Sequence, residues 1–205
     1  MMIELEIFSQ PGIDRINEDY VWHAEIVPGV SLIIVCDGMG GLSHGAEASE
    51  LAAHSIAGYI LSHYSDESPE QSIINGLKYA NDILATEIKR HSSKMGTSVG
   101  LALFSDNRCY YTWLGDVRIY HAQGEDVVLL TKDHLAIEGN HSFLSRCING
   151  KEFRTIPEIA EFTICSGDTI YIATDGYYLH NDVSLPLNLA TAVEDDATIV
   201  RIRLI

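Results

Sequence analysis

Residues 30–49 read VSLIIVCDGMGGLSHGAEAS, and they predict a strand, a loop and the start of a helix in that order. The run SLIIVC is continuously apolar, which indicates a fully buried central strand. Asp37 ends this run, and Gly38, Gly40 and Gly41 give the next segment conformational freedom. A carboxylate therefore lies at a sheet edge, where the glycines let a ligand approach the backbone. We interpret the stretch as part of a cation site, with an ordinary glycine-rich turn as the alternative.

Carboxylates also occur at the ends of other apolar runs. If these runs converge, their carboxylates repel one another and raise their pKa values unless a cation lies among them. Hard oxygen ligands suit Mg²⁺, Mn²⁺ or Ca²⁺ rather than zinc. A phosphate-binding loop is disfavoured, because no Gly-Lys-Ser/Thr follows the strand and GMGGLSHG does not match GxGxxG. The acidic positions are Glu18-Asp19, Asp37, Asp116, Asp175 and Asp195-Asp196.

The composition favours one folded domain and disfavours two kinds of partner. The chain has 205 residues, of which 46% are hydrophobic and 20% charged, enough for one well-filled core. A net charge of -16 argues against nucleic acid, whose phosphates require a basic face. An acidic N-terminus and the lack of a long apolar run predict no signal peptide and no membrane partner, so we expect a cytoplasmic protein. The four cysteines lack metal-binding spacing and are expected to be free thiols, most of them buried.

Ten short β-type runs and two helices are expected, in the order β-rich half, two helices, β-rich half. Strict βαβ alternation is absent, which disfavours a parallel sheet and favours two antiparallel sheets faced by helices. The runs are 3–9, 21–26, 30–36, 98–104, 108–113, 118–122, 126–130, 162–165, 169–173 and 198–205. The first helix is expected over 46–64, with a stripe of Ala48, Leu51, Ala52, Ser55 and Tyr59. The second follows a capping box at 68–71, with a stripe of Ile73, Leu77, Ala80, Leu84 and Ile88.

Seven blocks in a fixed order make the chain similar to the metal-dependent serine/threonine protein phosphatases of the type 2C (PPM) family. DGMGG followed by G-x-E-A-S resembles the family signature, and the blocks extend from about Gly12 to Val200. The other six are GIDRINEDY, MGTSVGLALF, WLGDVRIY, LTKDHL, IATDG and DDATIV. The resemblance implies an α+β fold, a four-layer α-β-β-α sandwich of two antiparallel sheets flanked by helices. It also implies a single phosphatase-like catalytic domain over residues 1–205.

The resemblance assigns metal ligands to individual residues. Asp37 would bridge two divalent ions, Mn²⁺ or Mg²⁺. Glu18 and the carbonyl oxygen of Gly38 would complete the protein ligands of one ion. Asp175 and Asp195 would hold the other ion. Two bound cations lower the pKa of a shared water, screen the phosphoryl charge and favour in-line attack.

Catalytic roles and departures from the family pattern follow from the same comparison. Besides Asp37, Asp19 would orient metal-bound water and Arg15 would clasp the substrate phosphate. Asp116 would belong to a third metal site, but the family's usual partner aspartate is replaced by Leu179, so a third ion should bind weakly or not at all. The segment after His134 is shorter than the flap that the family usually carries beside its active site.

The resemblance implies a metal-dependent protein phosphatase that hydrolyses phosphoserine and phosphothreonine by attack of a water activated at a two-metal centre. Its partner would be a phosphorylated protein from a serine/threonine kinase signalling pathway. Leu179 and the short flap motivate an alternative, a weak or inactive phosphatase-like module that binds a phosphoprotein or signalling partner. A structural calcium-binding domain is disfavoured because no D-x-D-x-D-G loop is present. A nuclease is disfavoured because the acidic chain offers no basic track.

Overall fold

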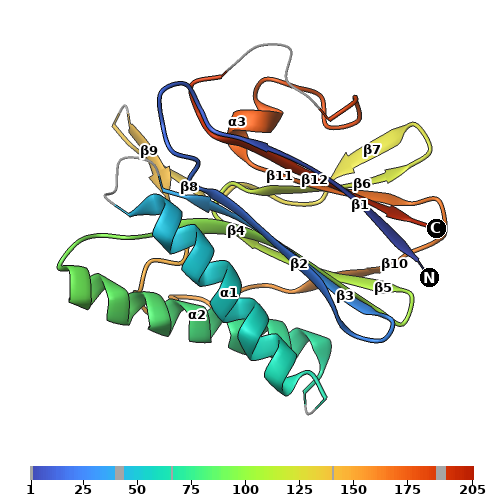
Figure 1. Ribbon diagram of the computed structural model, residues 1–205, viewed down its shortest axis with the longest axis horizontal. Helices are drawn as coiled ribbons and strands as arrows, with labels where there is room; N and C mark the ends of the chain where they lie inside the picture. The colour runs from blue at the N-terminus through green and yellow to red at the C-terminus, as the bar shows by residue number, and fades with distance from the viewer. Residues whose placement is uncertain (1, 40–43, 66, 140, 188–192) are drawn as a thin grey trace.

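The computed structural model describes residues 2–39, 44–65, 67–139, 141–187 and 193–205, and it contains two five-stranded antiparallel sheets packed face to face (Figure 1). The strand order is β1-β12-β11-β6-β7 in one sheet and β10-β5-β4-β3-β2 in the other. The strands are β1 (Ile3–Gln10), β2 (Asp19–Val27), β3 (Val30–Gly38), β4 (Thr97–Ser105), β5 (Arg108–Leu114), β6 (Arg118–Gln123), β7 (Asp126–Leu129), β8 (Leu135–Glu138), β9 (His141–Leu144), β10 (Ala160–Thr163), β11 (Thr169–Ala173) and β12 (Ala197–Leu204). The helices are α1 (Gly45–His63), α2 (Pro69–His91) and α3 (Asp175–Tyr178). The predicted α+β class with two antiparallel sheets is confirmed.

Strand β3 shows why its sequence is continuously apolar. Successive side chains of a strand point to opposite faces. Ile33 and Val35 pack in the core between the two sheets, whereas Leu32, Ile34 and Cys36 pack in the core beneath the helices. Both faces of β3 are therefore buried, as the unbroken run predicted.

The two long helices cover the outer face of the β3 sheet (Figure 1). Helix α2 begins as expected, because the Ser68 side chain accepts a hydrogen bond from the backbone N–H of Gln71 at 3.3 Å. Its predicted stripe is buried apart from Ile88, which is partly buried.

The predicted stripe of α1 is partly wrong. Ala48 and Ala52 are buried, but Leu51, Ser55 and Tyr59 are only partly buried. The buried face of α1 also includes Ala53, Ile56, Ala57 and Ile60. The small alanines allow α1 to pack against both α2 and the sheet, so its buried face is wider than a single stripe and rotated from the expected one.

The outer face of the β11 sheet has a much thinner cover. Among the described residues, the helical layer on this face is the four-residue helix α3, whose Tyr177 ring packs edge-on against Phe8 at 5.8 Å between centroids. Val183, Leu187 and Val193 complete this small apolar cluster. The expected fourth layer is thus much smaller than the layer formed by α1 and α2.

A hairpin of β8 and β9 was not predicted from the sequence. The two strands pair only with each other in the described structure, and Leu135, Ile137 and Phe143 are exposed. Because the hairpin contributes little to the core, its residues lack the alternation that identifies a half-buried strand. In Figure 1 it stands at the left, at the same end of the sandwich as the start of α1.

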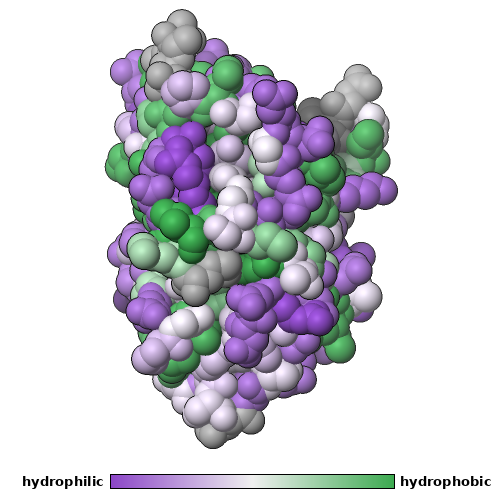
Figure 2. Space-filling view, turned by 90° about the vertical axis from the view of Figure 1, so that its right-hand side faces the viewer, coloured by the Kyte–Doolittle hydropathy of each residue, from purple (hydrophilic) through white to green (hydrophobic). Residues whose placement is uncertain are grey.

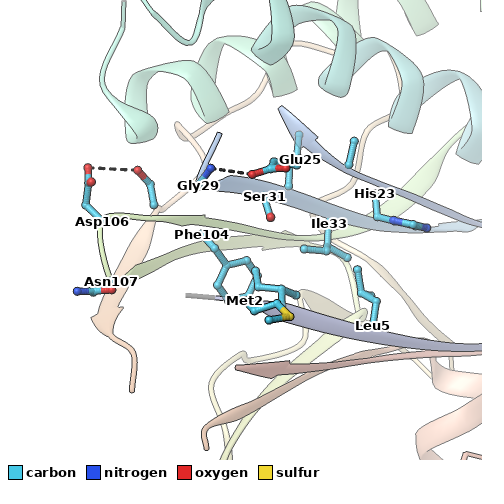
Figure 3. Close-up of a pocket in the computed structure, with 14 residues that line it drawn as sticks. Met2, Leu5, His23, Glu25, Gly29, Ser31, Ile33, Phe104, Asp106 and Asn107 are labelled. Atoms are coloured by element: carbon cyan, nitrogen blue, oxygen red, sulfur yellow. Dashed lines mark hydrogen bonds between the residues drawn. The ribbon is translucent and has the colours of Figure 1, made fainter. Parts of the chain in front are cut away.

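The opposite end of the sandwich carries both chain termini (Figure 1). Figure 2 shows this end face on, with polar and apolar residues interspersed. A pocket of about 810 Å³ opens here, where Leu5, Ile33 and Phe104 contribute apolar side chains and His23 and Glu25 polar ones (Figure 3). It lies about 20 Å along β3 from Asp37, from a rise of roughly 3.3 Å per residue. Among the described residues, no helix has the length and apolar character needed to cross a bilayer.

Candidate metal centre

Strand ends of both sheets converge at the hairpin end of the sandwich. Asp19 begins β2 and pairs directly with Asp37, next to the end of β3. Asp175 follows β11 at the start of α3, and Asp195 lies in the loop that leads into β12. Asp116 lies in the turn between β5 and β6. Because neighbouring antiparallel strands alternately begin and end at the same sheet edge, residues distant in sequence meet here.

All of these residues except Asp19 line a pocket of about 290 Å³. Four carboxylates, those of Asp37, Asp116, Asp175 and Asp195, line it together with Gly38. Among the described residues, the other lining residues are Met39, Ser98, Ser142, Phe143 and Leu144, and none of them carries a positive charge. The pocket is therefore smaller than the one at the opposite end, and its chemistry is dominated by carboxylate oxygens.

The carboxylates of this pocket destabilise one another in their ionised forms. Burial raises the pKa of Asp37 well above its usual range, and the charges of Asp19, Asp175, Asp116 and Asp195 raise it further. Burial, with the charges of Asp116 and Asp195, raises the pKa of Asp175 to about 6. Burial also raises the pKa of Asp116. A divalent cation among these oxygens would relieve the repulsion, so the donor set fits Mg²⁺ or Mn²⁺.

Asp19 is buried beside Asp37 with one oxygen unsatisfied. Its Oδ2 accepts a hydrogen bond from the Thr174 hydroxyl at 2.9 Å, whereas Oδ1 has no hydrogen-bond partner among the described residues. Burial raises the pKa of Asp19 to about 7. A buried polar atom without a partner is costly, which indicates that a ligand or an ordered water completes this site. The sequence placed Asp19 here but did not reveal Thr174 as its support.

Glu18 is held against the segment that leads into α1. Gly38 donates its backbone N–H to the Glu18 carbonyl at 3.0 Å, and the Ser49 hydroxyl donates to the same carbonyl at 2.6 Å. A Cβ added to Gly45 would lie 2.5 Å from Glu18 Oε1, so the carboxylate packs directly on this glycine. The glycine and serine of the G-x-E-A-S block therefore position Glu18. Gly40 and Gly41, also singled out in the sequence, lie outside the described residues.

Arg15 reaches the same region and is bound by carboxylates. Its Nη1 donates to Asp195 Oδ1 at 2.5 Å, and its Nη2 donates to Glu18 Oε2 at 2.9 Å. The buried Asp196 lies 3.4 Å from Nη2 and accepts the backbone N–H groups of Gly12 and Glu18, each at 2.8 Å. Asp196 therefore anchors the loop that carries Arg15 and Glu18.

Two features beside Asp116 were not identified from the sequence. The Ser98 hydroxyl donates a hydrogen bond to Asp116 Oδ1 at 3.0 Å. Phe143 and Leu144 of the β8–β9 hairpin line the pocket with it, so the segment predicted as a shortened flap forms a hairpin at the pocket. Its position after the Thr-x-Asp-His block was the only signal for this contact.

A stacked arginine supports the loop that carries Asp116. Arg118 makes a two-point ion pair with Asp133, at 3.0 and 2.8 Å, and its guanidinium lies 3.9 Å from the centroid of the Tyr178 ring. The Tyr178 hydroxyl in turn donates to the Asp116 carbonyl at 3.0 Å. Leu179, the next residue, is 65% exposed and is not among the residues that line the pocket. These contacts explain why the GDVR and LTKDHL blocks occur together.

Comparisons with known proteins agree with this geometry. The family described as protein phosphatase 2C matches residues 14–198. The serine/threonine protein phosphatase PstP of Mycobacterium tuberculosis is 27% identical over 191 residues, covering 82% of this chain and 35% of PstP. The protein phosphatase PhpP of Streptococcus pneumoniae is 30% identical over 136 residues, covering 64% of this chain and 55% of PhpP. The chain thus spans about a third to a half of the length of these relatives.

Solved structures share the fold over the whole described chain. A crystal structure of the Mycobacterium tuberculosis PstP/Ppp phosphatase superposes with a TM-score of 0.82 at 22% identity, covering 100% of this chain and 99% of that one. The catalytic domain of PstP in complex with two manganese ions gives a TM-score of 0.79 at 22% identity, covering 98% and 97% of the two chains. At this identity the likeness establishes the fold.

Proposed function

The chain belongs to the protein phosphatase 2C family, and we propose that it is a metal-dependent protein serine/threonine phosphatase. The observation that carries the proposal is the convergence of mutually repelling carboxylates in one pocket of this fold. We propose that residues 1–205 act as one catalytic domain. Its substrates would be phosphoserine and phosphothreonine proteins made by serine/threonine kinases, and we place it in the cytoplasm.

Two divalent ions, Mn²⁺ or Mg²⁺, fit the donor set of this pocket. Asp37 would bridge them, Glu18 and the Gly38 carbonyl would complete one site, and Asp175 and Asp195 the other. When bound, the ions supply Lewis-acid chemistry that activates water and screens the phosphoryl charge. A complex of the PstP catalytic domain with two manganese ions supports this number. We propose that Asp116 belongs to a third metal site. This site would bind an ion only weakly, because Leu179 stands where the family has a second aspartate and cannot act as a ligand.

The chain's own residues position the substrate and the attacking water. The free Oδ1 of Asp19 can accept a hydrogen bond from a water beside Asp37 and so orient its lone pair toward phosphorus. Arg15 can present its planar guanidinium to two phosphate oxygens once Glu18 and Asp195 are engaged elsewhere. The water oxygen then bonds to phosphorus and gives up a proton, the ester P–O bond breaks, and the leaving serine or threonine oxygen takes up a proton to become the free hydroxyl. No phosphoenzyme is required.

The proposal is tested by phosphate release from a phosphopeptide and from an aryl phosphate, with Mn²⁺ and after chelation. We expect Mn²⁺-dependent release, lost in Asp175→Asn and retained in the matched control Asp126→Asn on the exposed strand β7. Metal-independent release, full activity in Asp175→Asn, or a trapped phosphoenzyme would contradict it. Binding of phosphopeptide and metal in calorimetry without turnover would favour the alternative, a phosphoprotein-binding module, which Leu179 and the short hairpin motivate.

We also propose that the peptide flanking the phosphorylated residue lies in a basic groove beside the pocket. This groove, of about 670 Å³, shares Phe143 and Leu144 with the metal pocket. Its charged lining residues are three cations and one carboxylate, namely Arg146, Lys151, Arg154 and Glu152. None of the three cations makes an ion pair with a described carboxylate, although the chain carries a net charge of -16. Complementary charge would attract acidic residues of the substrate.

Peptides that differ only in flanking charge test this groove. We expect acidic phosphopeptides to be hydrolysed with a higher kcat/KM than neutral or basic ones. The double variant Lys151→Glu/Arg154→Glu should remove this preference by raising KM, while aryl phosphate hydrolysis, which involves no flanking residue, stays unchanged. Lys89→Glu/Lys94→Glu, with exposed side chains outside the groove, is the matched control. An unaltered preference in the groove variant would refute the assignment.

A further inference from the structure

A second group of potential metal ligands lies between the start of α1 and the end of α2. His44 precedes α1, Glu47 lies in its first turn, and His91 is the last residue of α2. Their ligand atoms all lie within 4.8 Å of one another, and each of the three residues is partly buried. The catalytic proposal uses none of them. The ends of α1 and α2 that carry them lie at the left in Figure 1, on the side of the β8–β9 hairpin.

We propose that His44, Glu47 and His91 form a zinc site. His44 Nδ1 lies 3.2 Å from Glu47 Oε2, and His91 Nε2 lies 3.1 Å from Glu47 Oε1. Ligands around a tetrahedral zinc ion with bonds of about 2.1 Å are separated by roughly 3.4 Å. Small side-chain rotations therefore bring the three donor atoms around one cation. Two helices fix the positions of Glu47 and His91, as a preformed site requires.

The donor types separate this site from the carboxylate pocket. Two imidazoles and one carboxylate are a zinc ligand set that leaves a fourth position open. Imidazole nitrogen suits Zn²⁺ much better than Mg²⁺ or Mn²⁺, which favour oxygen-only sites.

Arg90 competes for the same position. Its Nη2 lies 3.1 Å from His91 Nε2 and 3.6 Å from Glu47 Oε1, so in this arrangement the guanidinium stands near where the ion would bind. The Arg90 side chain is 64% exposed, and its Nε pairs with Glu87 Oε2 at 2.5 Å. It can therefore turn outward at little cost, and Glu87, 3.7 Å from His91 Nε2, remains on the same face of α2. The site therefore has two states, one in which the Arg90 guanidinium contacts Glu47 and His91 and one in which zinc takes its place.

Bound zinc would connect the start of α1 to the end of α2. Gly45, which follows His44, packs against the Glu18 carboxylate of the catalytic pocket. Occupation of the site would therefore hold fixed the segment on which Glu18 rests. This inference does not depend on phosphatase activity.

Zinc stoichiometry and cobalt spectroscopy test the site on the full chain. Zn²⁺ bound per chain is measured by elemental analysis after equilibrium dialysis, and Co²⁺ serves as a visible probe of nitrogen coordination. We expect His44→Ala/His91→Ala to lose one zinc equivalent and the Co²⁺ absorption band. The double variant His23→Ala/His180→Ala, with two exposed histidines elsewhere, should keep both.

Two further variants keep the test decisive if the double variant folds poorly. Glu47→Gln preserves size and should weaken zinc binding about tenfold or more by removing the charged ligand. Arg90→Ala removes the competitor and should tighten zinc binding several-fold, an effect that a simple ion-pair cluster does not produce. Unchanged zinc stoichiometry and Co²⁺ spectra in His44→Ala/His91→Ala would overturn the proposal, as would weaker zinc binding in Arg90→Ala.

Discussion

The carboxylate pocket and the His44–Glu47–His91 cluster flank the same glycine-rich segment, yet their carboxylates have opposite surroundings. Those of the pocket lie among other carboxylates, and that of the cluster lies among nitrogen atoms. In the pocket, Asp37 is surrounded by other carboxylates, which raise its pKa together with burial. In the cluster, both oxygens of Glu47 lie near nitrogen atoms, those of His44, His91 and Arg90. The pocket therefore requires an external cation to be stable when ionised. In the cluster, the Glu47 carboxylate already has nitrogen partners, so binding a metal ion only replaces the Arg90 contact with a contact to the ion.

The largest expected difference concerns activity. Asp37→Asn removes the charge that would bridge both ions, and several kcal/mol of transition-state stabilisation correspond to a loss on the order of 10³-fold or more in kcat. Glu47→Gln should change kcat by less than about fivefold, since the ion pairs of Glu47 with described residues are to His44, Arg90 and His91, none of which lines the pocket. Steady-state hydrolysis of an aryl phosphate at saturating Mn²⁺ measures both. Equal losses in the two variants would show that the two regions act as one site.

The second prediction concerns the pH dependence of stability without metal. The pKa of Asp19 is raised to about 7 and that of Asp175 to about 6, so the folded state holds protons that the unfolded state releases. The free energy of unfolding should therefore fall as the pH rises from about 4 to about 7, by an amount on the order of 5 kcal/mol in total. Asp168 and Glu6, whose pKa values are lowered, give up their stabilising effect only on acidification below about 4.

Urea unfolding in EDTA and in Mn²⁺, at about pH 5 and about pH 8, measures this slope. Mn²⁺ should remove most of this dependence of the free energy of unfolding on pH, because a bound cation keeps the carboxylates ionised in the folded state. Glu47→Gln should leave the slope unchanged, whereas Asp175→Asn should reduce it. Stability that rises with pH in EDTA over this window would contradict the view that the pocket carboxylates repel one another.

Much of the pocket followed from the sequence because its residues end continuous apolar runs. Asp37 lies near the end of the buried strand β3 and Asp175 follows the buried strand β11, and such apolar runs are readable without a structure. The contacts that complete the region were hidden, because they join distant segments. Thr174 supports Asp19 across 155 positions, and Ser98 supports Asp116 from another strand. Neither contact leaves a periodic signal in the chain.

The histidine cluster and the hairpin were beyond sequence reasoning for related reasons. His91 meets Glu47 only because α1 and α2 pack antiparallel, which places residues 44 positions apart in contact. An isolated histidine carries no pattern that names its partner. The β8–β9 hairpin lies outside the core, so burial did not shape its sequence. The buried face of α1 was misjudged because its alanines pack on two sides.

The third prediction tests the opposite balance of the two regions through stability. In EDTA at about pH 8, Asp37→Asn should raise the melting temperature, since it removes a carboxylate that is buried among like charges. Glu47→Gln should lower it by an amount that corresponds to about 1 kcal/mol or less, because it breaks partly exposed charged contacts. Calorimetry of both variants measures whether each substitution raises or lowers the melting temperature. A lower melting temperature for Asp37→Asn would mean that its packing outweighs the repulsion.

The smallest expected effect lies at Gly45, where the two regions meet. A methyl group there would lie 2.5 Å from Glu18 Oε1, and the end of this flexible side chain can move away. Gly45→Ala should therefore leave the melting temperature nearly unchanged in EDTA but weaken Mn²⁺ binding about threefold to tenfold, roughly 1 kcal/mol. Zinc binding at His44 and His91 should stay the same, since neither ligand moves. Isothermal titration with each metal separates these results, and a parallel loss of both affinities would contradict the expectation that the added methyl group acts on Glu18 alone.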